Sequence, residues 1–192
     1  GAYSPAPVLD AAIQSRVTNE IVEPTLRGMT DAGAPFSGVL YAGLMIGADG
    51  PKLIEYNVRF GDPECQVLMM RLESDVVPLL LSCAEGSLDQ AGASWFPECA
   101  LTVVMAASGY PGTAKTGSYV GGLAGLNNDQ VQVFHAGTAM QEGMTIATGG
   151  RVLNVTAIGS TVGEAQARAY EAVDKIDWPQ GFCRRDIGWR AL

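Results

Sequence analysis

The segment from residue 52 to residue 60 alternates between apolar and polar side chains, and this period restricts how the chain can fold. Its sequence is Lys-Leu-Ile-Glu-Tyr-Asn-Val-Arg-Phe. Because successive side chains of a strand point to opposite faces, Glu55, Asn57 and Arg59 are expected on one face, about 7 Å apart at each step. The other face is predicted to join the core, and it holds Ile54, Tyr56, Val58 and Phe60.

A second strand is expected just before this one. Residues 38–46 form a continuous apolar run of strand length. Residues 48–51 read Ala-Asp-Gly-Pro, which is typical of a turn. The two strands are therefore predicted to pair as a hairpin.

Three helices are expected in the first half of the chain. Residues 10–29 carry an apolar stripe, with Asp10 as N-cap and Pro24 as a kink or an end. A second helix is predicted to start with Asp62 as cap and Pro63 in its first turn. The third runs from Ser74 to about Glu85 and stops at Gly86.

The second half is predicted to be a smaller mixed domain. Its expected strands are 99–106, 131–135, about 144–148 and 151–158, with Gly149-Gly150 as a hairpin turn between the last two. Thr161 and Glu164 match a capping box, which predicts a helix through Asp174. Because residues 86–98 are polar and lack a period, two domains are predicted, 1–88 and 96–192.

Composition excludes several classes of function. The chain is 47% hydrophobic and 17% charged, which suits a globular protein with a core. Its net charge of −8 argues against nucleic acid or an anionic membrane as partner. The apolar runs are shorter than a bilayer span requires. Four widely spaced cysteines indicate reduced thiols, and thus a cytoplasmic protein.

The polar row has two interpretations. Glu55 and Asn57 offer the oxygen ligands that Mg²⁺ prefers, and Arg59 could clamp a carboxylate or stabilise a transferred phosphoryl group. The same pattern also fits a strand with one solvated face.

The residues that follow leave similar alternatives. Gly61 ends the strand, and Asp62 either caps the next helix or contacts a substrate. Arg151 starts a strand, in an exposed place from which it could reach a ribose phosphate. The only histidine, His135, lies on an apolar strand without a nucleophile motif, so a hydrogen-bonded structural role is favoured.

The motifs together resemble one enzyme family. Residues 59–66 read Arg-Phe-Gly-Asp-Pro-Glu-Cys-Gln, residues 1–7 Gly-Ala-Tyr-Ser-Pro-Ala-Pro, and residues 40–45 Leu-Tyr-Ala-Gly-Leu-Met. Residues 134–138 (Phe-His-Ala-Gly-Thr) and 185–190 (Arg-Asp-Ile-Gly-Trp-Arg) follow in the expected order. This pattern is similar to that of the glycinamide ribonucleotide synthetases of the ATP-grasp superfamily, and the likeness runs from Gly1 to Leu192.

The resemblance implies a fold and a site. The implied fold is α+β, with the carboxy-terminal part of an ATP-grasp domain followed by a small mixed domain. Glu55 and Asn57 would hold Mg²⁺ or Mn²⁺ on the phosphates of ATP, and Arg59 would face the reacting carboxylate or acyl phosphate as the catalytic residue. Gly61 and Asp62 would shape the glycine pocket.

The implied reaction is ATP-dependent ligation of glycine to 5-phosphoribosylamine through glycyl phosphate. The family's amino-terminal domain and ATP-covering lid precede the point where this sequence begins, so the chain is expected to be a partial enzyme, inactive alone. One departure is that residues 38–46 lack the acidic metal ligand that related ATP-grasp enzymes often carry there. Two alternatives stay open, namely another ATP-grasp ligase or carboxylase and a non-catalytic scaffold derived from such an enzyme.

Overall fold

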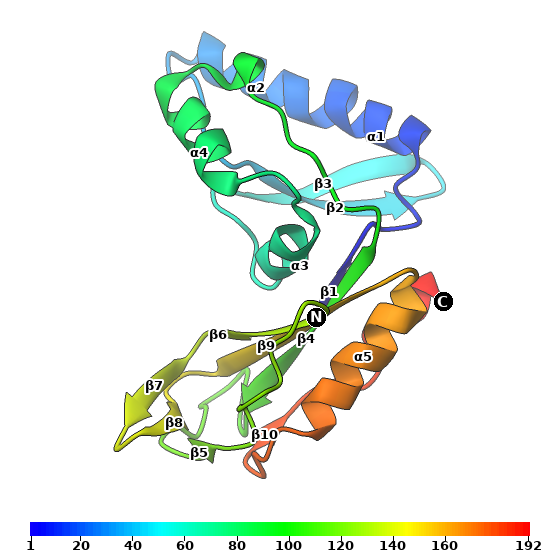
Figure 1. Ribbon diagram of the computed structural model, residues 1–192. Helices are drawn as coiled ribbons and strands as arrows, with labels where there is room; N and C mark the ends of the chain where they lie inside the picture. The colour runs from blue at the N-terminus through cyan, green and yellow to red at the C-terminus, as the bar shows by residue number, and fades with distance from the viewer. The chain divides into compact units, whose positions relative to one another are not determined.

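The computed structural model describes residues 1–192, which group into two units (Figure 1). The sheet unit comprises Gly1–Ser4, Asp62–Arg71 and Phe96–Leu192. The hairpin unit comprises Pro5–Gly61 and Leu72–Trp95. Each unit is described by itself below.

The sheet unit is built on an antiparallel sheet whose central strands are β4 (Cys99–Ala107) and β9 (Arg151–Gly159). The strand order is β1-β4-β9-β6, and β10 pairs with the end of β4. The outer strands are β1 (Ala2–Ser4), β6 (Val131–His135) and β10 (Gly181–Phe182). The predicted strands 99–106, 131–135 and 151–158 are confirmed, whereas β1 and β10 are too short to show a period.

Helix α5 (Val162–Asp174) packs on one face of this sheet, as Figure 1 shows. Its side chains Ala165, Ala169 and Val173 face inward and are buried. Facing them, Leu101 and Leu153 belong to the same buried cluster. Burial of this apolar area is the main stabilising contribution to the unit.

The opposite face of the sheet is more polar. Helix α3 (Glu64–Arg71) contacts β4 and β9 and buries Val67. The hydroxyl of Thr156 donates a hydrogen bond to that of Thr102 at 2.8 Å, and both side chains are buried. Because the two hydroxyls bind each other, this polar pair is accommodated inside the unit.

A second small sheet has the order β5-β8-β7. Its strands are β5 (Tyr119–Val120), β7 (Thr138–Gln141) and β8 (Met144–Ala147). The predicted hairpin turn at Gly149-Gly150 is therefore wrong, because β8 pairs with β5 and β7 while β9 pairs with β4 and β6. A Cβ atom on Gly137 would lie 2.8 Å from the Cα atom of Gly149, so the glycines let two backbones approach closely where the chain passes between the sheets.

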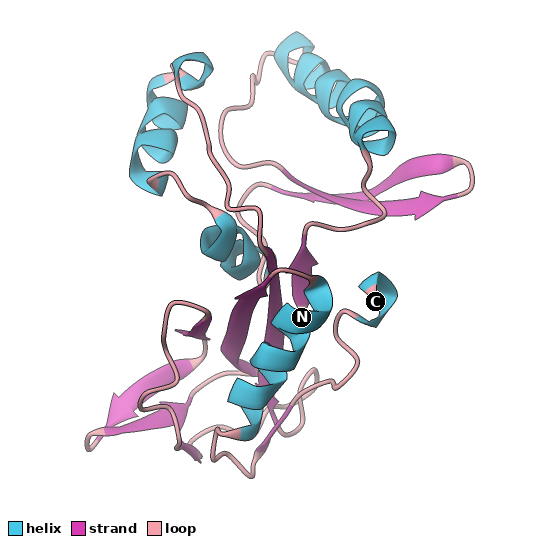
Figure 2. Ribbon diagram, turned by 45° about the vertical axis from the view of Figure 1, so that its right-hand side comes forward, coloured by secondary structure: helices cyan, strands magenta, loops and turns pink.

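The hairpin unit contains the predicted pair of strands, β2 (Tyr41–Gly47) and β3 (Gly50–Asn57), shown in Figure 2 with the helices. The predicted strand 52–60 is too long, because β3 ends at Asn57. The register shifts between Gly43 and Leu44, which leaves Ile54 without a partner on β2. Such a bulge interrupts the alternation of side chains.

The bulge explains a second correction, concerning the predicted core face of β3. Ile54 is 61% exposed and Val58, beyond the strand end, is 70% exposed. Tyr56 and Phe60 are half-buried. The Tyr56 hydroxyl lies 2.6 Å from Oγ1 of Thr25 and donates to the carbonyl of Ile21, which anchors the strand to a helix. A two-stranded sheet with one such anchor buries little apolar surface.

The predicted helix 10–29 is one continuous helical segment. It consists of α1 (Ala11–Val17), a π-helical turn (Thr18–Val22) and α2 (Glu23–Asp31), and Asp10 accepts from the N–H of Ile13 at 2.8 Å. Pro24 does not end the helix. The wider π turn directly before it accommodates the missing proline N–H.

The remaining helices are short. Helix α4 (Val76–Glu85) is capped by Asp75 rather than Ser74, and Gly86 ends it with φ +72°. Single 3₁₀ turns cover Leu88–Gln90 and Trp189–Ala191. No helix in the structure has both the length and the apolar character needed to cross a membrane.

The predicted domains 1–88 and 96–192 stay a proposal about domain division. The predicted division and the compact units both have a boundary next to residue 96. The compact units differ from the predicted division because β1 pairs with β4 and α3 packs on the same sheet, which assigns Gly1–Ser4 and Asp62–Arg71 to the sheet unit.

Candidate metal centre and substrate site

Glu55 and Asn57 lie side by side at the end of β3. The amide Nδ2 of Asn57 donates a hydrogen bond to Oε1 of Glu55 at 3.2 Å. Their partners across the hairpin are Gly43 and Tyr41 respectively. The two residues follow the bulge at Ile54, so the period of two holds between them and turns both side chains to one face.

This pair fits a hard divalent cation. A carboxylate and an amide, which carries a carbonyl oxygen, supply the oxygen ligands that Mg²⁺ and Mn²⁺ accept. The structure contains no group of three or more His, Cys, Asp or Glu side chains able to hold a metal ion. Two protein oxygens match the small number of protein ligands with which Mg²⁺ is typically held.

Arg59 does not share the strand with this pair. It lies in a bend after the strand, and its Nη1 donates to the carbonyl of Phe60 at 2.7 Å. The side chain is exposed. Its guanidinium is thus held by the local backbone rather than by the pleat of β3, and Gly61 follows two residues later.

Asp62 is predicted as a helix cap or as a substrate contact, and its carboxylate binds side chains instead of capping α3. Nη2 of Arg151 donates to its Oδ2 at 2.8 Å, and Nε2 of Gln66 donates to its Oδ1 at 3.5 Å. Helix α3 begins at Glu64, so Pro63 precedes the helix. The pairing joins two predicted site residues that are far apart in the sequence.

A cavity of about 280 Å³ adjoins this ion pair within the sheet unit. Arg151 and Arg184 contribute cationic groups to its wall, and Tyr110 and Phe182 contribute rings. Arg184 is also paired with Asp186, through two hydrogen bonds of 2.9 and 2.6 Å. Two guanidinium groups beside aromatic walls suit a ligand with an anionic group and an apolar or sugar-like body.

Tyr110 is a site residue that the sequence interpretation missed. Its ring packs directly on Gly150, where a Cβ atom would lie 2.6 Å from the ring. The only signal in the sequence is the turn-like Gly109-Tyr110-Pro111-Gly112, which does not say what the ring contacts. Cys183 lines the same cavity, and burial raises the pKa of its thiol, which therefore stays protonated at neutral pH.

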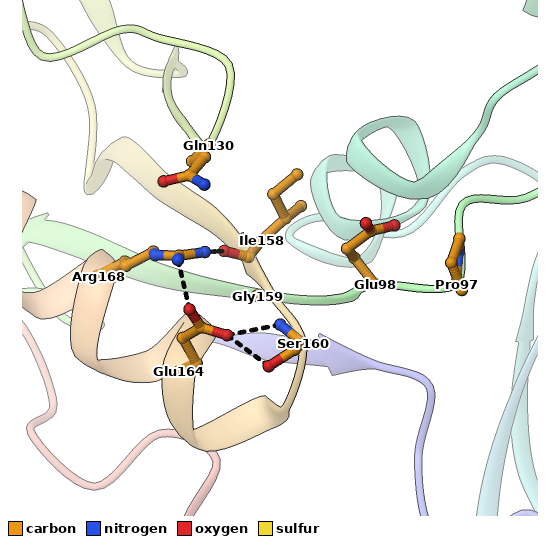
Figure 3. Close-up of a pocket in the computed structure, with 8 residues that line it drawn as sticks. All are labelled: Pro97, Glu98, Gln130, Ile158, Gly159, Ser160, Glu164 and Arg168. Atoms are coloured by element: carbon orange, nitrogen blue, oxygen red, sulfur yellow. Dashed lines mark hydrogen bonds and ion pairs between the residues drawn. The ribbon is translucent and has the colours of Figure 1, made fainter.

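A larger cavity, about 400 Å³, lies at the start of α5 and is shown in Figure 3. Three of its polar residues bind one another, whereas Oε2 of Glu98 is buried without a hydrogen-bond partner. Glu164 accepts from the N–H and hydroxyl of Ser160 and pairs with Arg168, which also donates to the carbonyl of Ile158. The hydroxyl of Thr161 accepts from the N–H of Glu164, as the capping box predicts. The second bond of the box differs, because the Glu164 carboxylate accepts from the N–H of Ser160 instead of that of Thr161.

These contacts cap the start of helix α5, beside the cavity in Figure 3, and their role is therefore structural. The cavity contains none of the predicted site residues. His135 is also outside the site cavity, and its Nδ1 lies 3.1 Å from Oγ1 of Thr138. A hydrogen-bonded histidine is what the sequence favoured.

Comparison with solved structures defines the class of fold. The structure matches the biotin carboxylase domain of the Hydrogenobacter thermophilus 2-oxoglutarate carboxylase with a TM-score of 0.66, covering 94% of this chain and 39% of that chain, at 16% identity. It matches the crystal structure of a phosphoribosylamine–glycine ligase from Thermotoga maritima with a TM-score of 0.82, covering 97% of this chain and 45% of that one, at 31% identity. The α+β fold is thus of the ATP-grasp class, as predicted.

The family follows from sequence comparisons. Residues 1–65 match the family model "Phosphoribosylglycinamide synthetase, ATP-grasp (A) domain", and residues 100–190 match "Phosphoribosylglycinamide synthetase, C domain". A phosphoribosylamine–glycine ligase of Mesorhizobium japonicum is 62% identical over the whole of this chain, and a chloroplastic one of Arabidopsis thaliana is 54% identical. The chain belongs to the phosphoribosylglycinamide synthetase family. It spans 45% of the Mesorhizobium relative and 37% of the Arabidopsis one.

Proposed function

We propose that the chain is part of a cytoplasmic ligase that joins glycine to 5-phosphoribosylamine with ATP, as a step of purine biosynthesis. The observation that carries this proposal is the Glu55–Asn57 pair, found in a chain that matches phosphoribosylamine–glycine ligases along its whole length. Glycine would first accept the γ-phosphoryl group on its carboxylate, which gives glycyl phosphate and ADP. The amine of 5-phosphoribosylamine would then displace phosphate, giving glycinamide ribonucleotide.

Glu55 and Asn57 would hold the divalent cation, Mg²⁺ or Mn²⁺. The cation would supply positive charge that neutralises the negative charge building up on the phosphates during transfer. For Asn57 this requires that its amide oxygen turn toward the cation. The present hydrogen bond to Glu55 uses the amide nitrogen, so binding would exchange one partner of Asn57 for another.

Arg59 would stabilise the acyl phosphate. Its exposed guanidinium follows the metal pair by two residues and carries fixed positive charge, which suits an anionic group. Gly61 and Asp62 would shape the glycine pocket. The Asp62 carboxylate also has a ready role toward the amino group of glycine, because a carboxylate accepts hydrogen bonds from an ammonium group.

Arg151 would bind the phosphate of the phosphoribosyl substrate in the cavity beside Tyr110 and Phe182. Its Nη2 already binds one anion, the carboxylate of Asp62, at 2.8 Å. A guanidinium has five donors, so Arg151 can keep this bond and still offer a second edge to a phosphate. Arg184, on the same wall, would add a second positive charge.

The proposed activity needs more than this chain, since the chain spans 45% of its Mesorhizobium relative. The other part of such a ligase would carry the ATP-covering lid. The isolated chain is therefore expected to release no ADP in the presence of ATP, glycine and 5-phosphoribosylamine. Glycine-dependent ADP release by the isolated chain would contradict this expectation.

The metal assignment is tested in a chimeric ligase, defined as the Mesorhizobium relative with its matching segment replaced by this chain. Adding Mg²⁺ and ADP is expected to raise the thermal midpoint of the chimera, and Asn57→Ala is expected to abolish most of that rise. Asn19→Ala, at an exposed asparagine on the helical segment, is the matched control and should keep it. An equal rise in the Asn57 variant would count against the assignment.

The same chimera separates the alternatives. A non-catalytic scaffold would show neither the metal-dependent rise nor any turnover. Another ATP-grasp ligase would show the rise but release ADP with a carboxylate other than glycine. Glycine-specific ADP release that depends on 5-phosphoribosylamine supports the proposed reaction over both.

A further inference from the structure

We propose that Gly43 is a positioning residue for the metal ligand Glu55, because its missing side chain leaves the space in which the Glu55 carboxylate reaches Asn57. This inference rests on the proposed metal site. It concerns a residue that would touch neither the cation nor a substrate.

The register of the hairpin places the two residues opposite each other. Gly43 on β2 pairs with Glu55 on β3, and Tyr41 pairs with Asn57 two positions further. Directly opposed side chains in an antiparallel pair lie about 5 Å apart at their Cβ atoms, so they compete for the same space. With glycine at position 43, Glu55 has no such competitor.

The distances show how close this space is. A Cβ atom built on Gly43 would lie 3.1 Å from Cγ of Glu55, 3.4 Å from its carbonyl oxygen and 3.8 Å from its nitrogen. A separation of 3.1 Å between two carbon atoms is well inside their optimal distance of about 3.5–4.0 Å. The aliphatic part of Glu55 therefore lies over Gly43 and would have to move if a methyl group were added.

Movement of Glu55 would reach the proposed metal pair directly. The carboxylate of Glu55 is at the far end of the same side chain, and its Oε1 is 3.2 Å from Nδ2 of Asn57. Because Glu55 is exposed, its side chain can move away from a bulkier residue without unfolding the hairpin. A side chain at position 43 would then change the relative positions of the Glu55 and Asn57 oxygens more than it would change the stability of the hairpin.

The bulge next to Gly43 strengthens this dependence. The register shifts between Gly43 and Leu44, so Gly43 is the last residue of β2 before Ile54 interrupts the ladder. A bulge re-aims the side chains beside it. Glu55 and Asn57 are thus oriented by two of the three pairings that follow the bulge, one of which involves Gly43.

Gly47 provides a matched control on the same strand. It pairs with Gly50 at the other end of β2, and a Cβ atom there would meet no atom within 4 Å. A side chain at Gly47 thus changes strand composition and backbone entropy in the same way as one at Gly43. It does so without contacting Glu55.

The experiment measures Mn²⁺ binding in the chimeric ligase, in the presence of ADP, from the electron paramagnetic resonance signal of free Mn²⁺. Gly43→Val is expected to raise the dissociation constant of Mn²⁺ about tenfold, which is the lower end of the range for changes around metal ligands. Gly43→Ala, which adds a smaller group, is expected to raise it about threefold. Gly47→Ala and Gly47→Val should leave it unchanged. Thermal midpoints without metal should not fall in the Gly47 series, because glycine loses more backbone entropy on folding than alanine or valine does. They should change little in the Gly43 series, because the exposed Glu55 side chain can move aside.

The outcomes distinguish this inference from the function on which it rests. If Asn57→Ala weakens Mn²⁺ binding and both Gly43 variants bind as the wild type does, the positioning role is overturned and the metal site stands. If the wild-type chimera binds no Mn²⁺, both are overturned. If Gly43→Val does not fold, Gly43→Ala decides alone, because it adds one methyl group at a position that can shift.

Discussion

The sheet unit and the hairpin unit differ most in what they bury. The sheet unit has a continuous apolar core that includes Leu101, Val103, Leu153 and Val155. The hairpin unit contributes no residue to the buried hydrophobic set, and several of its large apolar side chains are exposed, among them Ile54, Val77 and Leu81. The sheet unit is therefore stabilised by a core of its own, whereas the hairpin unit holds the proposed metal pair on a framework with little buried apolar surface.

The exposed apolar surface of the hairpin unit agrees with the proposed partial enzyme. Exposed apolar patches in soluble proteins commonly mark surfaces that another chain segment covers. The chain spans 45% of its Mesorhizobium relative.

Truncation of the buried core should have the largest effect. Leu101→Ala is expected to lower the free energy of unfolding of the chain by about 2–5 kcal/mol, because Leu101 is fully buried in the sheet unit. Leu81→Ala, at an exposed position of α4, should change it by less than about 0.5 kcal/mol. Trp95 and Trp189 are first replaced by Phe, so that only the buried Trp178 reports on the sheet unit. Urea unfolding followed by Trp178 fluorescence then measures both variants, and equal losses would contradict the comparison.

Removal of helix caps should have an intermediate effect. Thr161→Ala is expected to cost about 1 kcal/mol, since the Thr161 hydroxyl accepts from the N–H of Glu164 at the start of α5. Asp75 caps α4 in the same way, by accepting from the N–H of Val77 at 2.9 Å. Asp75→Ala should reduce helicity by circular dichroism but leave the Trp178 transition in place. A shift of that transition equal to the shift for Thr161→Ala would show that the two units unfold together.

The ion pair of the proposed substrate site should contribute less. Arg151 and Asp62 have side chains 39% and 35% exposed, so a double-mutant cycle with Arg151→Ala and Asp62→Asn is expected to give a coupling of about 0.5–1 kcal/mol. The pair Arg16–Glu20 on the helical segment is more exposed and should give a smaller coupling. Both coupling energies should fall with added salt. A larger coupling energy for Arg16–Glu20 than for Arg151–Asp62 would contradict the expectation that the ion pair of the sheet unit contributes more.

The smallest effect concerns acid stability. Hydrogen bonds from the hydroxyl and N–H of Ser160, with the charge of Arg168, lower the pKa of Glu164. Because the folded pKa is below the unfolded one, this carboxylate adds stability above the unfolded pKa of about 4.3 and loses it as the pH falls through the folded value. Glu164→Gln should therefore flatten the decline of the Trp178 urea midpoint below about pH 5.

Glu20 provides the control in the hairpin unit. Its pKa is lowered by the hydrogen bond from Arg16, so the sign of its contribution is the same. Glu20→Gln should nevertheless leave the Trp178 midpoint unchanged at each pH, because it acts on the other unit. A midpoint that responds to Glu20→Gln as strongly as to Glu164→Gln would contradict the separation of the units.

The elements that depend on local chemistry could be predicted from the amino-acid sequence. Long apolar runs predicted β4 and β9, and Thr161 with Glu164 predicted the start of α5, because periodicity and capping act over a few residues. The neighbouring positions of Glu55 and Asn57 were predicted for the same reason, since a period of two needs only three residues of strand. The family resemblance was also readable from the motifs alone.

Contacts between residues that are far apart in the chain became known only from the folded structure. Arg151 binds Asp62 across 89 positions, and β1 pairs with β4 across almost the whole first half of the chain. The end of β3 at Asn57 and the bulge at Ile54 depend on pairing with β2, so the period within residues 52–60 could not place Arg59. Such pairings depend on contacts between segments that are far apart in the chain, and a local pattern carries no information about them.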